Sequence, residues 1–171
     1  MSERKPVLFD RALKPEWVDF ALDRFVQSGS EKELRDELRG WLQAKGFGFY
    51  TVSKTALQLQ RTVGYRSPLP RRELEDAYAT MRELVPEARR DLRLALVLKA
   101  NRFLADVHAC MKRAKLNGVA GLTVQELYER MQSEYGYRGM IPRRVRYALQ
   151  TLVHFGVVEH TGKRWALRDG P

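Results

Sequence analysis

Residues 122–167, LTVQELYERMQSEYGYRGMIPRRVRYALQTLVHFGVVEHTGKRWAL, decide the fold of this 171-residue chain. Thr123–Glu126 has the Thr-x-x-Glu pattern of a capping box, which predicts that a helix begins there and ends at Tyr135–Gly136. After a short turn, Pro142 suits the first turn of a second helix, because the N–H it lacks would be unpaired there. Gly156 ends that helix, so the stretch reads first as helix, turn, helix.

Two short runs of β-prone residues follow the second helix. Val157–Val158 and Trp165–Leu167 flank a tight turn at Thr161–Gly162, which predicts a two-stranded hairpin. Helix, turn, helix and hairpin is the order of a winged helix-turn-helix, and residues 122–167 resemble that superfamily. The resemblance implies that the second helix enters the major groove of DNA and that the hairpin touches the backbone or minor groove beside it.

Charge supports this interpretation. Between Met140 and Arg168 there are six basic residues and one acid, Glu159. Arginines at the start of a recognition helix can pair with guanine or phosphate, and the hairpin tip can contact the backbone. The residues expected to contact DNA are Arg143, Arg144, Arg146, Tyr147, Gln150, Lys163, Arg164 and Arg168. The alternative is that these charges only solvate the surface, or that the winged helix docks a protein.

The preceding residues show helical spacing of apolar side chains, divided by prolines and glycines. We therefore predict an all-α fold with a small C-terminal β-hairpin, composed of an N-terminal helical bundle and a winged helix-turn-helix. Residues 1–85 form the N-terminal helical region and residues 86–117 a long central helix that packs on both halves. A break of that helix near Asn101 stays open. Residues 118–171 form the winged helix-turn-helix.

Composition restricts the classes of protein to which this chain can belong. Lys and Arg total 31 against 21 Asp and Glu, a net charge of +10 that favours a polyanionic partner, nucleic acid first. One Cys allows no intrachain disulfide. No apolar run is long enough to span a bilayer, and none follows the first six residues as a signal peptide would require. We expect a cytoplasmic protein without a membrane partner.

A second basic stretch lies in the middle of the chain and could be a further phosphate track or a solvated helix face. Its members are Lys54, Arg61, Arg66, Arg71 and Arg72.

Enzyme signatures are missing from the sequence. There is no phosphate-binding loop, no nucleophile elbow and no cysteine pair for zinc. Glu73, Glu75 and Asp76 lie beside two arginines and are expected to form surface ion pairs, and Cys110 is expected to be a core residue. We therefore expect no catalytic residue, no metal and no cofactor.

Short motifs along the whole chain resemble the accessory DNA-binding proteins of bacteriophage exclusion (BREX) systems in bacterial phage-defence islands. They are Lys14–Asp19, Phe103–Val107, Tyr135–Arg138, Arg143, Ala148–Leu149 and Phe155–Val157. This resemblance implies a helical body joined to a winged helix, binding of double-stranded DNA without enzymatic activity, and larger defence proteins as partners.

We therefore expect a non-enzymatic protein that binds double-stranded DNA as an accessory factor of an anti-phage defence system. Two alternatives remain. One is an adaptor or scaffold subunit whose winged helix contacts protein, with an exposed apolar patch that includes Phe47, Phe49 and Tyr50. The other is a transcriptional regulator of its own operon, which requires a homodimer on a palindromic site.

Overall fold

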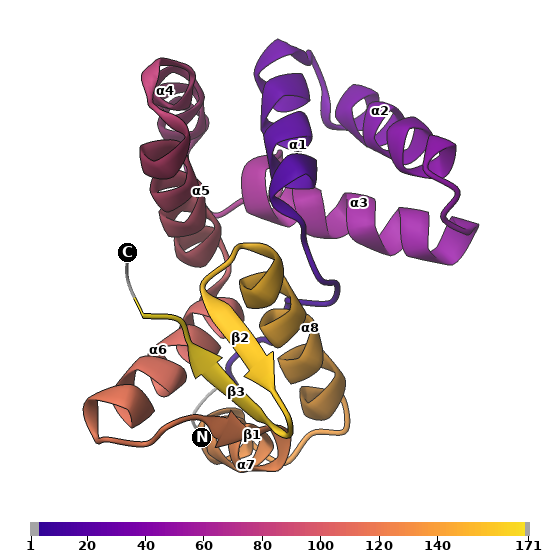
Figure 1. The fold of residues 1–171 in the computed structure, drawn as a ribbon. Coiled ribbons are helices and arrows are strands. Elements are labelled where there is room, and N and C mark those ends of the chain that lie inside the picture. Colours follow the sequence, from indigo (N-terminus) through magenta and orange to yellow (C-terminus); the bar gives the residue numbers. More distant parts are fainter. Residues whose placement is uncertain (1–3, 170–171) are drawn as a thin grey trace. The chain divides into compact units, whose positions relative to one another are not determined.

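The computed structural model describes residues 4–169, which contain eight helices and one three-stranded antiparallel sheet near the C-terminus (Figure 1). The predicted fold class, all-α with a small C-terminal β-hairpin, is confirmed. The chain divides into two compact units. Residues 13–101 form the helical unit, and residues 102–169 together with residues 4–12 form the winged unit.

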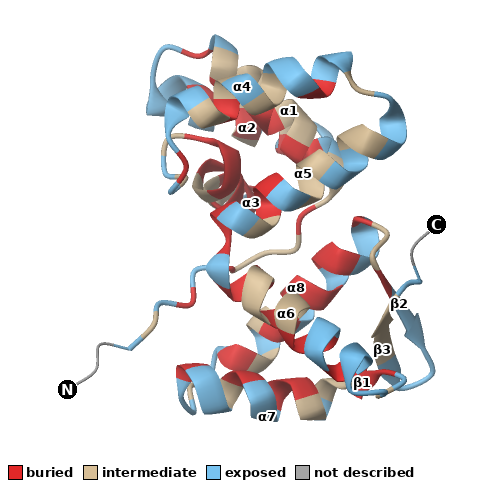
Figure 2. Ribbon diagram, turned by 90° about the vertical axis from the view of Figure 1, so that its left-hand side faces the viewer, coloured by how far each residue is buried: buried red, intermediate tan, exposed pale blue. Residues whose placement is uncertain are grey.

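Five helices build the helical unit. They are α1 (Pro15–Gln27), α2 (Glu31–Ala44), α3 (Phe49–Val63), α4 (Arg71–Glu83) and α5 (Pro86–Ala100). The Ser30 hydroxyl accepts the Glu33 N–H at 3.1 Å and so caps α2, as the sequence predicts. Leucines at helical spacing in α2 and α3, such as Leu34, Leu38 and Leu59, are fully buried. Figure 2 shows buried residues along the helices of both units.

The stretch 86–117, expected as one helix with an open question at Asn101, is two helices. α5 ends at Ala100 and α6 (Arg102–Leu116) begins after Asn101, whose backbone is extended. Buried hydrogen bonds hold this residue there: its amide nitrogen donates to the Thr62 hydroxyl at 3.1 Å, and its amide oxygen accepts from Gln58 at 3.1 Å. The two helices belong to different units, so the stretch is not a central helix shared by both halves.

The winged unit has the element order that the sequence predicts, with one strand added. After α6 come β1 (Leu122–Thr123), α7 (Val124–Tyr135), α8 (Ile141–His154), β2 (Val158–Thr161) and β3 (Arg164–Leu167). The strand order is β1-β3-β2, all antiparallel, and the hairpin turn lies at Gly162–Lys163, one residue later than expected. α8 packs against α6, α7 and β2 to enclose the core of this unit.

Local chemistry explains where α7 begins and ends. The capping box is confirmed, since the Thr123 hydroxyl accepts the Glu126 N–H while the Glu126 side chain accepts the Thr123 N–H. Gly136 ends the helix with φ +90°, a conformation that favours glycine. Gly121 precedes β1 with φ +148°, and a Cβ there would lie 3.3 Å from the carbonyl of Trp165 on β3. That close approach allows the short β1 to pair with β3.

The N-terminal segment, residues 4–12, is part of the winged unit although the sequence assigns it to the helical region 1–85. Val7 and Phe9 are buried in it. Arg138 donates to the carbonyl of Lys5 at 2.8 Å, and the Lys5 ammonium lies 3.1 Å from the Glu134 carboxylate. Polar contacts therefore attach the segment to the end of α7 and to the turn that follows it.

Candidate nucleic-acid interface

Helix α8 presents its polar side chains in two groups. Residues three or four positions apart share a face of a helix, so Arg143, Arg146 and Gln150 lie together and Arg144 and Tyr147 lie beside them. The first three are exposed, whereas Arg144 and Tyr147 are half-buried. The sequence predicts all five as DNA contacts, and the structure separates them into these two groups.

The N-terminal segment occupies the side of α8 that carries Arg144 and Tyr147. The Arg144 guanidinium donates to the carbonyl of Val7 and lies 3.5 Å from the Asp10 carboxylate. The Arg11 guanidinium donates to the hydroxyl of Tyr147. Arg144 and Tyr147 therefore hold the segment within the winged unit, and their polar groups are engaged there.

The exposed group of α8 is supported from α7. The Arg146 Nε donates to the hydroxyl of Tyr128 at 2.6 Å, and this hydrogen bond raises the pKa of the Arg146 guanidinium above its ordinary value. The contact orients the stem of the side chain and leaves other guanidinium N–H groups for a ligand. Arg143 and Gln150 are exposed one turn to either side.

The hairpin carries the other predicted contacts. Lys163 is exposed in the turn between β2 and β3. Arg164 donates to the carbonyl of Gly121 at 2.8 Å, which ties the hairpin to the residue before β1. The Arg168 Nε lies 3.8 Å from the Glu159 carboxylate, and both side chains are exposed. Of these three cations, Lys163 is at the tip and Arg164 and Arg168 are partly used to brace the sheet.

A groove of about 440 Å³ joins the exposed group of α8 to the hairpin. Its described lining comes from α7, α8, β1 and the hairpin: Thr123, Val124, Gln125, Arg146, Gln150, His160, Gly162, Lys163 and Trp165. None of these nine lining residues is acidic. The rings of His160 and Trp165, a cross-strand pair, stack with centroids 3.8 Å apart and planes 4° from parallel. We call the groove together with Arg143 the α8–wing face.

Several residues of this surface escape the sequence analysis. Gln125, His160 and Trp165 line the groove, and none of them is among the residues expected from the sequence to contact DNA. The register of β2 and β3 pairs His160 with Trp165, which places both side chains on one side of the hairpin.

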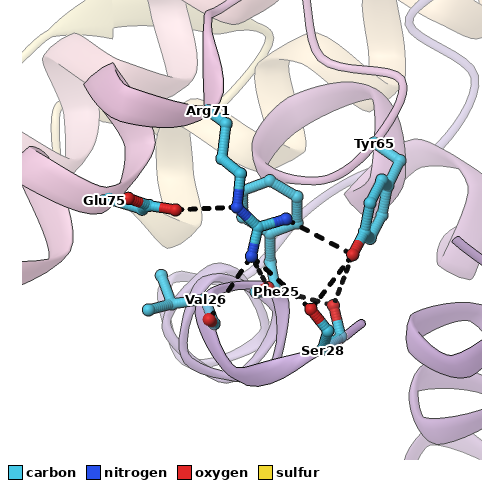
Figure 3. Close-up of polar contacts among 6 residues, drawn as sticks. All are labelled: Phe25, Val26, Ser28, Tyr65, Arg71 and Glu75. Atoms are coloured by element: carbon cyan, nitrogen blue, oxygen red, sulfur yellow. Dashed lines mark hydrogen bonds and ion pairs between the residues drawn. The ribbon is translucent and has the colours of Figure 1, made fainter. Parts of the chain in front are cut away.

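The second basic stretch is used largely inside the helical unit. Arg71, at the start of α4, holds the C-terminus of α1 (Figure 3). Its guanidinium donates to the carbonyl of Phe25 at 3.1 Å and of Ser28 at 3.5 Å, to the Tyr65 hydroxyl at 3.3 Å, and to Glu75 at 2.7 Å. The hydrogen bond to Tyr65, followed by that to Glu75, raises the pKa of Arg71.

The other members of this stretch do not form one continuous set of unengaged cations. Arg66 donates to Glu31 at 2.6 Å. The remaining members differ in exposure: Lys54 and Arg61 are half-buried and Arg72 is exposed. The structure therefore gives Arg66 and Arg71 partners within the fold.

Two of the three acids that the sequence expects in surface ion pairs, Glu73 and Glu75, form them. Glu73 pairs with Lys99 and Glu75 with Arg71. Within residues 4–169, no three His, Cys, Asp or Glu side chains gather in a way that could hold a metal ion. Cys110, expected in the core, is buried in α6.

In the described part of the chain, every helix is too short or too polar to cross a membrane.

No protein-family model, no curated protein and no solved structure matches the chain. Function is therefore inferred from the geometry and charge of the α8–wing face.

Proposed function

We propose that the protein binds double-stranded DNA through the α8–wing face and has no enzymatic activity. The observation that carries this proposal is the groove between α8 and the hairpin, where Arg146 and Lys163 converge from two elements and no lining residue is acidic. A concave surface of one charge sign concentrates the opposite charge, and a duplex is the polyanion that matches a helix flanked by a hairpin.

The chemistry of the side chains suits both parts of a duplex. Lys163 at the hairpin tip can neutralise a backbone phosphate. Arg143 and Arg146 can contact phosphate or pair with guanine, and the amide of Gln150 can pair with adenine. A helix suits the wide major groove of B-form DNA, whereas the major groove of RNA is too narrow for side chains to enter.

The cellular setting belongs to the same proposal. The resemblance to accessory proteins of phage-defence islands suggests that the chain binds DNA on behalf of larger defence proteins. A regulator of its own operon would use the same face, but it would require a preferred palindromic site and a dimer with matching half-site spacing. The salt and sequence dependence of binding separates these two roles.

Fluorescence anisotropy with a random duplex of about 30 base pairs tests the proposal directly. The logarithm of the affinity should fall steeply as salt rises, by about 0.9 per neutralised phosphate for each unit of log salt. The double variant Arg146→Ala with Lys163→Ala should bind at least about tenfold more weakly and show a shallower salt slope, by about 2.

The matched control removes the same charge elsewhere in the winged unit. Lys112 and Arg113 are exposed on α6, outside the groove, so Lys112→Ala with Arg113→Ala should leave affinity close to that of the unmodified chain. Equal losses of duplex affinity in the two double variants would show that the loss comes from the lower net charge and not from the groove. Absence of duplex binding at low salt would remove the DNA proposal and favour the adaptor role.

A further inference from the structure

The helical unit exposes two large aromatic side chains in succession. Phe49 and Tyr50 form the start of α3, and they are 83 % and 63 % exposed. The sequence analysis expects both in one exposed apolar patch with Phe47, but Phe47 packs edge-on against Trp17, with ring centroids 5.6 Å apart. Two adjacent aromatic rings with exposed fractions this high are unusual on a surface that contacts only water. We call Phe49, Tyr50 and the flanking Lys45 and Lys54 the α3 aromatic edge.

The chain around this edge has one sign of charge. Residues 38–72 contain seven basic residues and no Asp or Glu. The segment that carries the edge therefore contributes cations and no carboxylate of its own. Charge complementarity requires a partner that is anionic where it meets these rings.

The lysines lie against ring faces. The Lys54 ammonium is 5.7 Å from the centre of the Tyr50 ring, and the Lys45 ammonium is 4.3 Å from the centre of the Trp41 ring. Trp41 in turn stacks on Phe20, with centroids 4.0 Å apart and planes 8° from parallel. Each lysine of the edge therefore lies beside an aromatic ring, Lys54 beside Tyr50 and Lys45 beside Trp41.

From these observations we propose that the α3 aromatic edge binds single-stranded nucleic acid. Each nucleotide of a single strand presents one phosphate and one planar base, and such strands bind where cations accompany protruding rings. An acidic protein segment offers the charge, but rings as exposed as Phe49 would need a preformed pocket in that partner. The edge shares no residue with the α8–wing face, so the two proposals stand separately.

The test is anisotropy with a fluorescent deoxythymidine oligomer of about 20 nucleotides, which forms no duplex. Phe49→Ala with Tyr50→Ala should weaken binding at least about tenfold, since loss of a stacking ring costs about 1–3 kcal/mol per base. Phe49→Tyr should keep the affinity and Phe49→Leu should lose it, because a ring face and not apolarity alone is required. Val85→Ala, another exposed apolar side chain of the helical unit, should change nothing.

A second comparison separates this proposal from the duplex site. Adding Phe49→Ala and Tyr50→Ala to the Arg146→Ala, Lys163→Ala variant should weaken oligomer binding by the same factor as in the unmodified chain. Duplex binding should fall on loss of Arg146 and Lys163 and not on loss of the two rings. An oligomer that does not bind at low salt, or binds equally well without the two rings, would overturn the proposal. Ring-dependent binding of an alternating Glu-Phe peptide without oligomer binding would overturn it in favour of an acidic protein.

Discussion

Asn101 shows how one polar residue can divide a helix. Helical spacing of apolar residues continues through it, so sequence periodicity alone leaves the break undecided. The decision comes from residues about 40 positions earlier, since Gln58 and Thr62 on α3 hydrogen-bond the two ends of the Asn101 amide. The amide also donates to the carbonyl of Val97 at 2.9 Å, at the end of α5.

Replacing Asn101 by Ala should therefore destabilise the helical unit. The change leaves the buried Gln58 amide without its acceptor, and an unsatisfied buried group of this kind costs about 1–3 kcal/mol. The free energy of unfolding in urea measures the loss. Asn117→Ala, an exposed asparagine after α6, is the control and should stay within about 0.5 kcal/mol of the unmodified chain. Equal stability of the two variants would contradict the role of the network.

His108 gives the winged unit a dependence on pH. Burial, and then the charge of Lys112, lower the pKa of this imidazole below its ordinary 6.5. Above pH 6.5 the ring is neutral in both states, so the full stability is present. As pH falls below 6.5, the unfolded chain takes up a proton that the folded chain resists, so stability declines. The melting temperature should therefore fall from pH 7.5 to 5.5.

His108→Gln should flatten this decline, because the glutamine does not titrate. Lys112→Ala should flatten it less, since burial is the larger cause of the lowered pKa. Thermal melts followed by circular dichroism over this pH range provide the measurement. A His108→Gln slope as steep as that of the unmodified chain would show that other groups cause the loss.

At the scale of elements, α8 carries out two tasks on adjacent sides. Arg143 is exposed, whereas the guanidinium of Arg144, about one fifth exposed, is engaged by Val7 and Asp10. Adjacent positions of a helix point about 100° apart, so neighbouring arginines can meet entirely different surroundings. The sequence shows two equivalent arginines, and only the N-terminal segment distinguishes them.

These two arginines should separate affinity from stability. Arg144→Ala should lower the free energy of unfolding by about 1–3 kcal/mol, because it removes the donor to the part-buried carbonyl of Val7 and the ion pair with Asp10. Arg143→Ala should change stability by less than about 0.5 kcal/mol but weaken duplex binding. Each variant serves as the control of the other in urea unfolding and duplex anisotropy. If the Arg144→Ala variant keeps its stability but loses as much duplex affinity as Arg143→Ala does, Arg144 belongs to the DNA interface.

Elements with strong local signals could be predicted from the sequence, and those that depend on distant partners could not. The Thr123–Glu126 capping box and Pro142 locate α7 and α8 closely, since both signals act within one helical turn. β1 has two residues and exists because Gly121 lets the backbone approach β3, more than 40 positions later. The groove needs the same long-range pairing, so Gln125 and Trp165 could not be joined from the sequence.

The whole molecule consists of two cores, and the helical unit interrupts the winged unit in sequence. The chain begins in the winged unit, builds the helical unit from residues 13–101, and returns to the winged unit at α6. Each unit buries its own large apolar residues, such as Leu38 and Leu59 in one and Phe9, Leu127 and Leu149 in the other. The N-terminal segment is therefore far in sequence from the helices it completes.

This arrangement predicts different behaviour when the chain is divided. Residues 13–101 alone should fold and melt cooperatively, because all five helices and their shared core are present. Residues 102–171 alone lack Val7 and Phe9. Adding a synthetic peptide of residues 4–12 should raise the melting temperature of this fragment, because a ligand that binds only the folded state stabilises that state. The Phe9→Ala peptide should have no such effect, because the buried ring supplies most of the apolar contact. If the peptide does not change the melting temperature of the 102–171 fragment, the contacts of Arg138 and Arg144 with the segment are not required for stability. The winged unit would then be complete without residues 4–12.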